Sequence, residues 1–387
     1  FRNSNGDDCL MNRRRLTFLI TELDQGGAER ALVQIVTRLS AEKWDRRVIS
    51  LGPRGLLAEP LEEAGISVDC LNIVSRRDPR SLWQATVGLT RLLRQHQPDL
   101  LQTFLFHANM AGRFAGKLAG VPRVVSGIRV AERRGRFRLS LDRWTERLVD
   151  RHVCVSRSVA DFSVQMSGLD PSKVVVIPNG VDIDRFKNAI PADRSRFGIP
   201  ADADVILSVG RLDEQKNPHL LLDGFEIARK RHPGLHLLFV GHGPLESDLK
   251  DRVAAAELTE VVLFAGWQPD IPELMKAADL LVLASRWEGM PNVVLEAGAA
   301  GLPVISTRVE GVLEILEHGR TGTLIDSGDA QTLAECIERT FLNSPSGAGQ
   351  TRNSSGGGES QNLPAPESQN QPHNAAQEMA SALQALV

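Results

Sequence analysis

Two loops in the second half of the chain carry residues that could bind a sugar phosphate. The first follows an apolar run that ends at Ala284 and carries the carboxylates Glu288 and Glu296. Pro291 suits the first position of a helix, because its missing N–H group would have no intrahelical partner there. A helix N-terminus attracts anions, and carboxylates suit the hydroxyls of a sugar. Spacing alone leaves an equal alternative, in which Glu288 is a loop charge and Glu296 lies on a solvated helix.

The second loop follows a run that ends at Val209 and carries Arg211 and Lys216. Asn217 is expected to cap the next helix and Pro218 to occupy its first position. Arginine can hold phosphate with two hydrogen bonds, and lysine acts as a mobile point charge. Two basic loop residues are more often solvated than functional. Beside the first loop, at the same sheet end, they indicate a phosphate site.

Three further positions follow predicted strands. Gly26 and Gly27 form a turn that lets backbone approach a ligand closely, but they lack the GxGxxG spacing of dinucleotide sites, which leaves NAD a weak alternative. Gly241 is as well explained by an ordinary turn as by a nucleotide contact. His107 follows a predicted strand, and a lone histidine is more often structural than catalytic.

The composition excludes several classes of protein. The 387 residues are 42% hydrophobic and 24% charged, and 45 Lys and Arg against 48 Asp and Glu give a formal charge of −3. This balance argues against a protein that wraps nucleic acid. The four cysteines lie far apart in sequence, with no CxxC pair and no histidines at zinc spacing, so neither a disulfide framework nor a zinc knuckle is indicated, which favours a reducing compartment. The apolar runs are far shorter than the roughly 20 residues that span a bilayer, and none resembles a signal peptide.

The elements that position these residues alternate between β-like runs and helical patterns, as in parallel sheets with crossover helices. In the first half we expect strands at 15–20, 47–51, 66–70, 99–104, 122–126, 151–155 and 173–177. In the second half we expect them at 205–209, 235–240, 261–265, 280–284, 302–306 and 323–325. Pro178, Asn179 and Gly180 mark a boundary between two doubly wound α/β domains, 15–180 and 181–341, which should face each other across a ligand cleft.

The two ends of the chain differ from these domains. Residues 1–14 are predicted to be a disordered extension, with Met11 as the natural start. In 343–374, 24 of 32 residues are Gly, Ser, Asn, Gln or Pro, so the segment 342–374 cannot bury enough apolar surface to order itself. A short helix is predicted over 375–387.

With Gly26-Gly27, Arg211, Lys216 and the Glu288-x7-Glu296 spacing, the chain resembles the retaining glycosyltransferases of family 4, which have the two-domain GT-B fold. The resemblance implies a metal-independent enzyme without cofactor that moves a sugar from a UDP- or GDP-sugar to a glycan or lipid-linked acceptor of envelope or exopolysaccharide biosynthesis. It implies that 15–180 is the acceptor-side domain and 181–341 the donor-binding domain. It assigns catalytic roles to His107, Arg211, Lys216 and Glu288. It assigns donor contacts to Gly26, Gly27, Gly210, Gly241, Gly289, Met290, Pro291, Asn292, Val293 and Glu296.

A surplus of arginine bears on the location of the protein. Residues 123–152 hold nine arginines against four acidic residues. Such a surplus is usually a solvated face, but on a nearly neutral protein the region Arg123 to Arg151 could bind anionic lipid. We therefore expect a cytoplasmic protein that can lie at the inner face of the plasma membrane.

Two alternatives remain open from the sequence. Paired carboxylates also serve glycoside hydrolases, but a hydrolase does not explain Arg211 and Lys216. A catalytically inactive nucleotide-sugar-binding protein with the same fold is the other alternative.

Overall fold

The computed structural model describes residues 13–24, 26–73, 79–131, 136–326, 328–342 and 381. Strand β1 begins at Arg14 and helix α13 ends at Leu342. These two residues, which were predicted to belong to the disordered segments 1–14 and 342–374, therefore lie in regular secondary structure. The rest of both segments, and the helix predicted over 375–387 apart from Ser381, lie outside the described residues. The chain divides into two compact units, one up to Gly180 and one from Val181.

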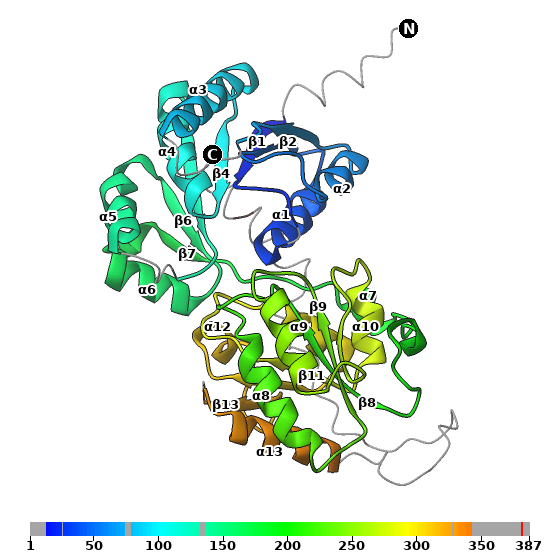
Figure 1. Cartoon of the computed structure of the whole chain (residues 1–387). Helices are drawn as coiled ribbons and strands as arrows, with labels where there is room; N and C mark the ends of the chain where they lie inside the picture. The colour runs from blue at the N-terminus through cyan, green and yellow to red at the C-terminus, as the bar shows by residue number, and fades with distance from the viewer. Residues whose placement is uncertain are drawn as a thin grey trace, which may run out of the picture. The chain divides into compact units, whose positions relative to one another are not determined.

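The first unit is a parallel sheet of seven strands in the order β3-β2-β1-β4-β5-β6-β7 (Figure 1). Its strands are β1 (Arg14–Ile20), β2 (Trp44–Ser50), β3 (Ser67–Cys70), β4 (Leu100–Phe104), β5 (Arg123–Ile128), β6 (Arg151–Cys154) and β7 (Val174–Val176). Its helices are α1 (Gly27–Arg38), α2 (Ala58–Glu63), α3 (Pro79–His96), α4 (Phe106–Ala119), α5 (Arg136–Thr145), η1 (Glu146–Leu148), α6 (Arg157–Ser167) and η2 (Pro171–Lys173).

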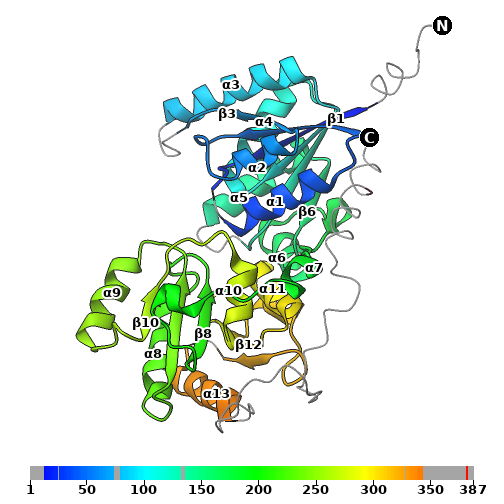
Figure 2. The same ribbon diagram turned by 90° about the vertical axis from the view of Figure 1, so that its right-hand side faces the viewer.

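Both faces of this sheet are buried, which explains why its strands read as continuous apolar runs. Phe18 of β1 packs in one core cluster with Leu32 of α1, and its neighbour Leu19 packs in another with Leu89 of α3. Successive side chains of a strand point to opposite faces. Helices α1 and α2 therefore cover one face and α3 and α4 the other (Figure 2).

The second unit is a parallel sheet of six strands in the order β10-β9-β8-β11-β12-β13. Its strands are β8 (Asp204–Val209), β9 (Leu235–Val240), β10 (Val262–Phe264), β11 (Leu280–Leu283), β12 (Val304–Thr307) and β13 (Thr323–Ile325). Its helices are α7 (Ile183–Lys187), η3 (Arg194–Phe197), α8 (Pro218–Arg229), α9 (Glu246–Ala255), α10 (Ile271–Ala277), α11 (Asn292–Ala300), α12 (Glu310–Leu313) and α13 (Ala330–Leu342). Helices α8 and α13 pack together on one face (Figure 1).

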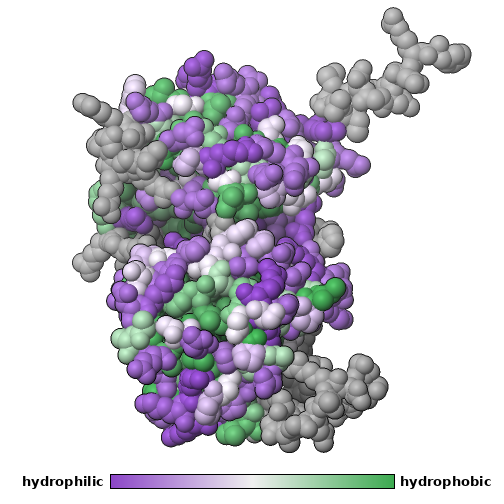
Figure 3. All heavy atoms as spheres, turned by 45° about the vertical axis from the view of Figure 1, so that its right-hand side comes forward, coloured by the Kyte–Doolittle hydropathy of each residue, from purple (hydrophilic) through white to green (hydrophobic). Residues whose placement is uncertain are grey.

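Each sheet has one point where the strand order reverses, between β1 and β4 and between β8 and β11. In open α/β sheets, ligands bind outside the carboxyl ends of the strands at such a point. Polar residues in the loops after these four strands are therefore the candidates for function. The exterior drawn in Figure 3 is mostly hydrophilic, with hydrophobic residues in small groups.

Candidate functional site

A partly buried ion pair joins the two loops that the sequence singles out. Lys216 Nζ lies 2.6 Å from Glu288 Oε1, and the side chains are only 23% and 7% exposed. The Ser285 hydroxyl donates to the same Glu288 oxygen at 2.6 Å. Because β8 and β11 are neighbours in the sheet, the loops after them place a cation and a carboxylate together at its carboxyl edge.

Backbone and side-chain hydrogen bonds hold the two loops to each other. The Arg286 backbone N–H donates to the Gln215 carbonyl at 2.8 Å, and the Gln215 amide donates to the Trp287 carbonyl at 3.1 Å. Within the loop after β8, Asp213 accepts from the backbone N–H of Lys216 at 3.0 Å and pairs with Arg211 at 2.8 Å. These hydrogen bonds therefore fix the backbone of the two loops that carry Arg211, Lys216 and Glu288.

The helix after β11 differs in detail from the sequence prediction. Helix α11 begins at Asn292, and Pro291 is its N-cap, with φ −75° and ψ 110°, rather than its first helical residue. The extended ψ of Pro291 accounts for the one-residue shift. Met290 and Val293 are buried. Glu296 is buried as well, which is contrary to the alternative that placed it on a solvated helix.

The start of α8 is capped in an unexpected way. Pro218 does occupy the first turn, as predicted, but Asn217 has a left-handed backbone with φ 50° and its side chain makes no capping hydrogen bond. Asp213 instead satisfies a backbone N–H of the preceding loop. Asn217 is therefore the N-cap residue, as predicted, but its side chain does not supply the capping hydrogen bond.

Two glycines of the predicted donor site touch through their backbones. Gly241 follows β9 with φ 129°, and a Cβ atom placed on it would lie 2.1 Å from the carbonyl oxygen of Gly210. Any larger residue at 241 would push the β8 and β9 loops apart. Close packing against the loop that carries Lys216 therefore explains why this turn has a glycine at position 241.

In the first unit, the glycine turn after β1 is already covered by a carboxylate. Gly26 is the N-cap of α1, and a Cβ atom on it would lie 2.1 Å from Oε2 of Glu29. Glu29 is buried and is the third residue of the helix, the position from which a glutamate folds back over the N-cap. The open backbone approach expected at Gly26 and Gly27 therefore requires Glu29 to move.

His107 lies just after β4, as the sequence predicts. It is the second residue of α4 and packs edge-on against Phe106 with 5.6 Å between ring centroids. The preceding Leu105 has φ 73°, which is unusual for a residue with a side chain and is typical of functional turns. The catalytic role of His107 stays a prediction.

Several residues of the site were missed by the sequence interpretation. Ser285, Asp213 and Thr307 hold the charged residues or their loop, Thr307 through a 2.5 Å hydrogen bond to the Ser285 carbonyl. A polar residue directly after a buried strand was an available signal for Ser285. The Asp213 to Lys216 spacing of three residues is that of a helix N-cap, whose side chain accepts from a backbone N–H two or three residues on. Among the described residues no group of three or more His, Cys, Asp or Glu side chains could hold a metal ion.

Two protein-family models match the chain, and each covers most of one unit. A model described as Glycosyltransferase Family 4 matches residues 25–185, and one described as Glycosyl transferases group 1 matches residues 189–354. The UDP-Gal:alpha-D-GlcNAc-diphosphoundecaprenol alpha-1,3-galactosyltransferase of Escherichia coli is 30% identical over 329 residues, which are 81% of this chain and 84% of that protein. The chain belongs to glycosyltransferase family 4.

Other relatives agree with this family-4 assignment. The lipopolysaccharide core biosynthesis glycosyltransferase LpsE of Rhizobium meliloti is 30% identical over 320 residues, 81% of this chain and 85% of that one. The structure of Anabaena HepE in complex with UDP and glucose superposes with a TM-score of 0.82 at 22% identity, over 96% of this chain and 100% of that one. The predicted GT-B fold, with two doubly wound parallel-sheet domains, is confirmed.

Proposed function

We propose that this family-4 glycosyltransferase moves a sugar, with retention of configuration, from a UDP- or GDP-sugar to a glycan or lipid-linked acceptor of envelope or exopolysaccharide biosynthesis. The observation that carries the proposal is the partly buried Lys216–Glu288 pair at the switch point of the second sheet. The names of two relatives support it: one uses a UDP-galactose donor and a GlcNAc-diphosphoundecaprenol acceptor, and another acts in lipopolysaccharide core biosynthesis.

The charges of the site suit the departure of a nucleoside diphosphate. Negative charge builds on the leaving phosphate as its bond to the anomeric carbon breaks, and preorganised cations aimed at it are usually the largest catalytic contribution. Arg211 is exposed and pairs with Asp213, a type of ion pair that is weak enough to be exchanged for a phosphate. Lys216 supplies the second cation. The acceptor attacks from the face that the diphosphate leaves, so no protein nucleophile is assigned.

The remaining contacts follow from position. Glu288, held by the Ser285 hydroxyl, accepts hydrogen bonds from hydroxyls of the donor sugar, and Glu296 accepts from the ribose. The other proposed donor contacts are Gly26, Gly27, Gly210, Gly241, Gly289, Met290, Pro291, Asn292 and Val293. Metal independence belongs to the proposal, with the two cations taking the place that Mg²⁺ has in other phosphate sites.

Thermal shift with a panel of nucleotides tests donor binding. A ligand at 100 times its dissociation constant stabilises the folded state by about 2.7 kcal/mol, so UDP or GDP and the matching sugars should raise the melting temperature. Lys216→Ala should reduce this shift, whereas Lys250→Ala, an exposed lysine of α9, should not. Equal shifts in both variants would contradict the role of Lys216. Donor binding without any sugar transfer would favour the inactive alternative.

The described arginines of the region Arg123 to Arg151 differ in exposure. Arg123 begins β5 and pairs with Asp150, and Arg151 begins the neighbouring parallel strand β6. Arg129 follows the other end of β5 and is buried, so it does not belong to an exposed patch.

A smaller surface of α4, α5 and η1 combines aromatic rings with cations. Phe137 and Trp144 are 74% and 60% exposed and lie two turns apart on one face of α5. Phe114 of α4 contacts the Trp144 ring at 6.2 Å, and Arg147 lies over the same ring at 5.6 Å. Exposed aromatic side chains beside arginine suit the interface of an anionic membrane. Within the described part of the chain, every helix is too short or too polar to cross a bilayer.

Liposome co-sedimentation tests this peripheral location. The double variant Phe137→Ser, Trp144→Ser should lose binding to vesicles that contain phosphatidylglycerol. Ile190→Ser, which alters a 79% exposed residue of the second unit, should keep it. Binding by the wild type that does not depend on anionic lipid would contradict the proposal.

A further inference from the structure

Arg129 is a buried cation that the donor site does not use. It follows β5 directly, at the carboxyl edge of the first sheet, and is only 7% exposed. Burial lowers the pKa of its guanidinium to about 10, so it remains charged at neutral pH. Burying a charge is costly unless other groups compensate it. The position therefore requires an explanation.

The described contacts of Arg129 use little of its hydrogen-bonding capacity. A guanidinium has five N–H donors, and the described side-chain hydrogen bond of Arg129 goes to Asn179, just before the end of the first unit. Its charge also lies over the Phe104 ring, 5.6 Å from the centroid. The Glu29 carboxylate is near enough to raise the Arg129 pKa.

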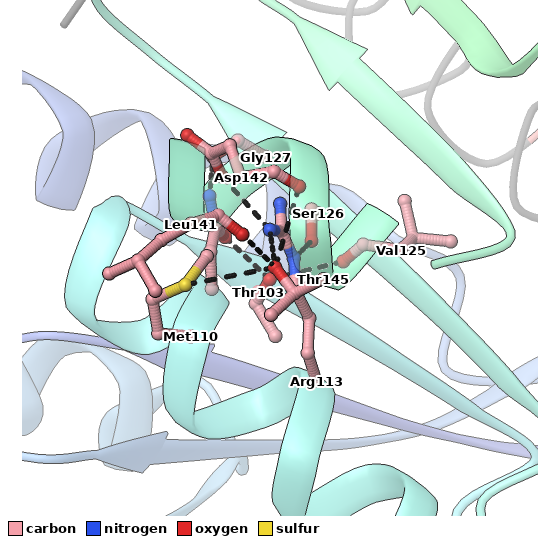
Figure 4. A network of polar contacts seen from close by, with 10 residues as sticks. Thr103, Met110, Arg113, Val125, Ser126, Gly127, Leu141, Asp142 and Thr145 are labelled. Atoms are coloured by element: carbon pink, nitrogen blue, oxygen red, sulfur yellow. Dashed lines mark hydrogen bonds and ion pairs between the residues drawn. The ribbon is translucent and has the colours of Figure 1, made fainter. Parts of the chain in front are cut away.

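Arg113, a buried arginine of the same unit, shows what a purely structural guanidinium looks like (Figure 4). It is fully buried and donates to Ser126 at 3.1 Å, to Asp142 at 2.9 Å and to Thr145 at 2.7 Å. These bonds tie α4 to β5 and α5. Arg129 has no such set among the described side chains, and it lies at the carboxyl edge of the sheet, where open α/β sheets bind their ligands.

We propose that Arg129 is the cationic anchor of a subsite in the first unit that binds a phosphoryl group of the acceptor. The inference rests on the proposed function, because it assumes an acceptor that carries phosphate. Four segments converge on the subsite: β5 supplies Arg129, the β4 end supplies Phe104, the end of the unit supplies Asn179, and α1 supplies Glu29. A guanidinium fork matches phosphate geometry with two parallel hydrogen bonds.

Glu29 acts in this subsite as the counter-charge that the ligand replaces. Its carboxylate lies over the Gly26 turn, where a helix N-terminus favours an anion. Burial raises the pKa of the nearby Cys154 thiol to about 12, so this group is neutral and Glu29 is the anion whose charge raises the Arg129 pKa. An incoming phosphoryl group competes with Glu29 for the same cation.

Binding of geranyl diphosphate to the full chain in the presence of saturating UDP, measured by calorimetry, tests the subsite. UDP occupies the second unit, and no sugar transfer is needed. Arg129→Gln should weaken binding by about tenfold or more, because it removes a charged hydrogen-bond donor pair. Arg123→Gln, at the other end of the same strand, should change it by less than about twofold. Glu29→Gln should tighten binding by about threefold, since a competing like charge is removed.

The outcomes separate this subsite from the donor site. Wild-type affinity in folded Arg129→Gln, or weaker binding in Glu29→Gln, would overturn the proposal. So would preferential binding of methyl glucuronide, a carboxylate probe, over the diphosphate. If Arg129→Gln fails to fold, Asn179→Ala supplies the same test, with a smaller loss expected. Failure of UDP to bind would count against the donor assignment alone, because the diphosphate titration can be repeated without it.

Discussion

At the scale of single residues, the site depends on polar groups that are buried and partnered. Glu288 accepts from both Lys216 and Ser285, so its carboxylate is held in one place before a donor arrives. A group held in advance costs no reorganisation during the reaction. This residue should therefore affect the sugar more than the nucleotide.

Glu288→Gln should lower kcat/KM for the nucleotide sugar by about 10- to 100-fold, the effect of losing a charged hydrogen bond. The affinity for the nucleotide diphosphate alone should stay within about twofold, because Glu288 is assigned to sugar hydroxyls. Steady-state kinetics and calorimetry measure the two quantities, and Glu260→Gln on the exposed surface serves as the control. An equal loss of nucleotide and nucleotide-sugar affinity would contradict the assignment.

His152 of β6 should make the protein acid-sensitive. The side chain is buried, neither ring nitrogen has a described partner, and burial lowers its pKa from 6.5 to about 3. The unfolded chain then binds a proton that the folded chain does not, so the free energy of unfolding falls as the pH drops from about 6.5 toward about 3. Urea unfolding of His152→Leu should show a weaker dependence over this range. An unchanged slope would assign the acid sensitivity to other groups.

At the scale of elements, the second-unit site is a consequence of strand order. The loops after β8, β9 and β11 come from neighbouring strands, and their backbones pack against each other at Gly210 and Gly241. This packing helps to position Lys216 and Glu288. It follows that a change in the turn should alter both stability and ligand binding.

Gly241→Ala should destabilise the second unit by about 1–3 kcal/mol, because its positive φ and the 2.1 Å approach to Gly210 both exclude a Cβ atom. The nucleotide affinity should fall with it. Gly234→Ala is a matched control just before β9, where a Cβ atom meets nothing within 4 Å. Chemical denaturation measures the difference, and equal stabilities of the two variants would show that the turns can separate freely.

Elements were easier to predict than the contacts between their side chains. Each predicted strand occurs within a few residues, because strands buried on both faces are continuous apolar runs. The region Arg123 to Arg151 was expected to offer a lipid-binding surface, but Arg129, after the carboxyl end of β5, is buried, whereas Arg123 at the start of the same strand is exposed. Composition along a sequence does not record which end of a strand a residue occupies.

At the scale of the whole molecule, the chain has two units with parallel sheets and belongs to glycosyltransferase family 4. The family could be predicted from Arg211, Lys216, Glu288 and Glu296, because their spacing after two strands is specific. The position of the Glu29 carboxylate over Gly26 could not be predicted. It depends on a side-chain conformation, whereas the sequence indicates only a glycine turn at this place.

Sugar transfer itself is the most direct test of the central claim. The wild type, Lys216→Ala and Lys250→Ala are each incubated with radiolabelled UDP- and GDP-sugars and a lipid-diphosphate glycan acceptor, and the labelled product is counted. We expect retained-configuration product from the wild type and Lys250→Ala, and at least about tenfold less turnover from folded Lys216→Ala. Transfer at the wild-type rate by Lys216→Ala at saturating donor would contradict the assignment of the site.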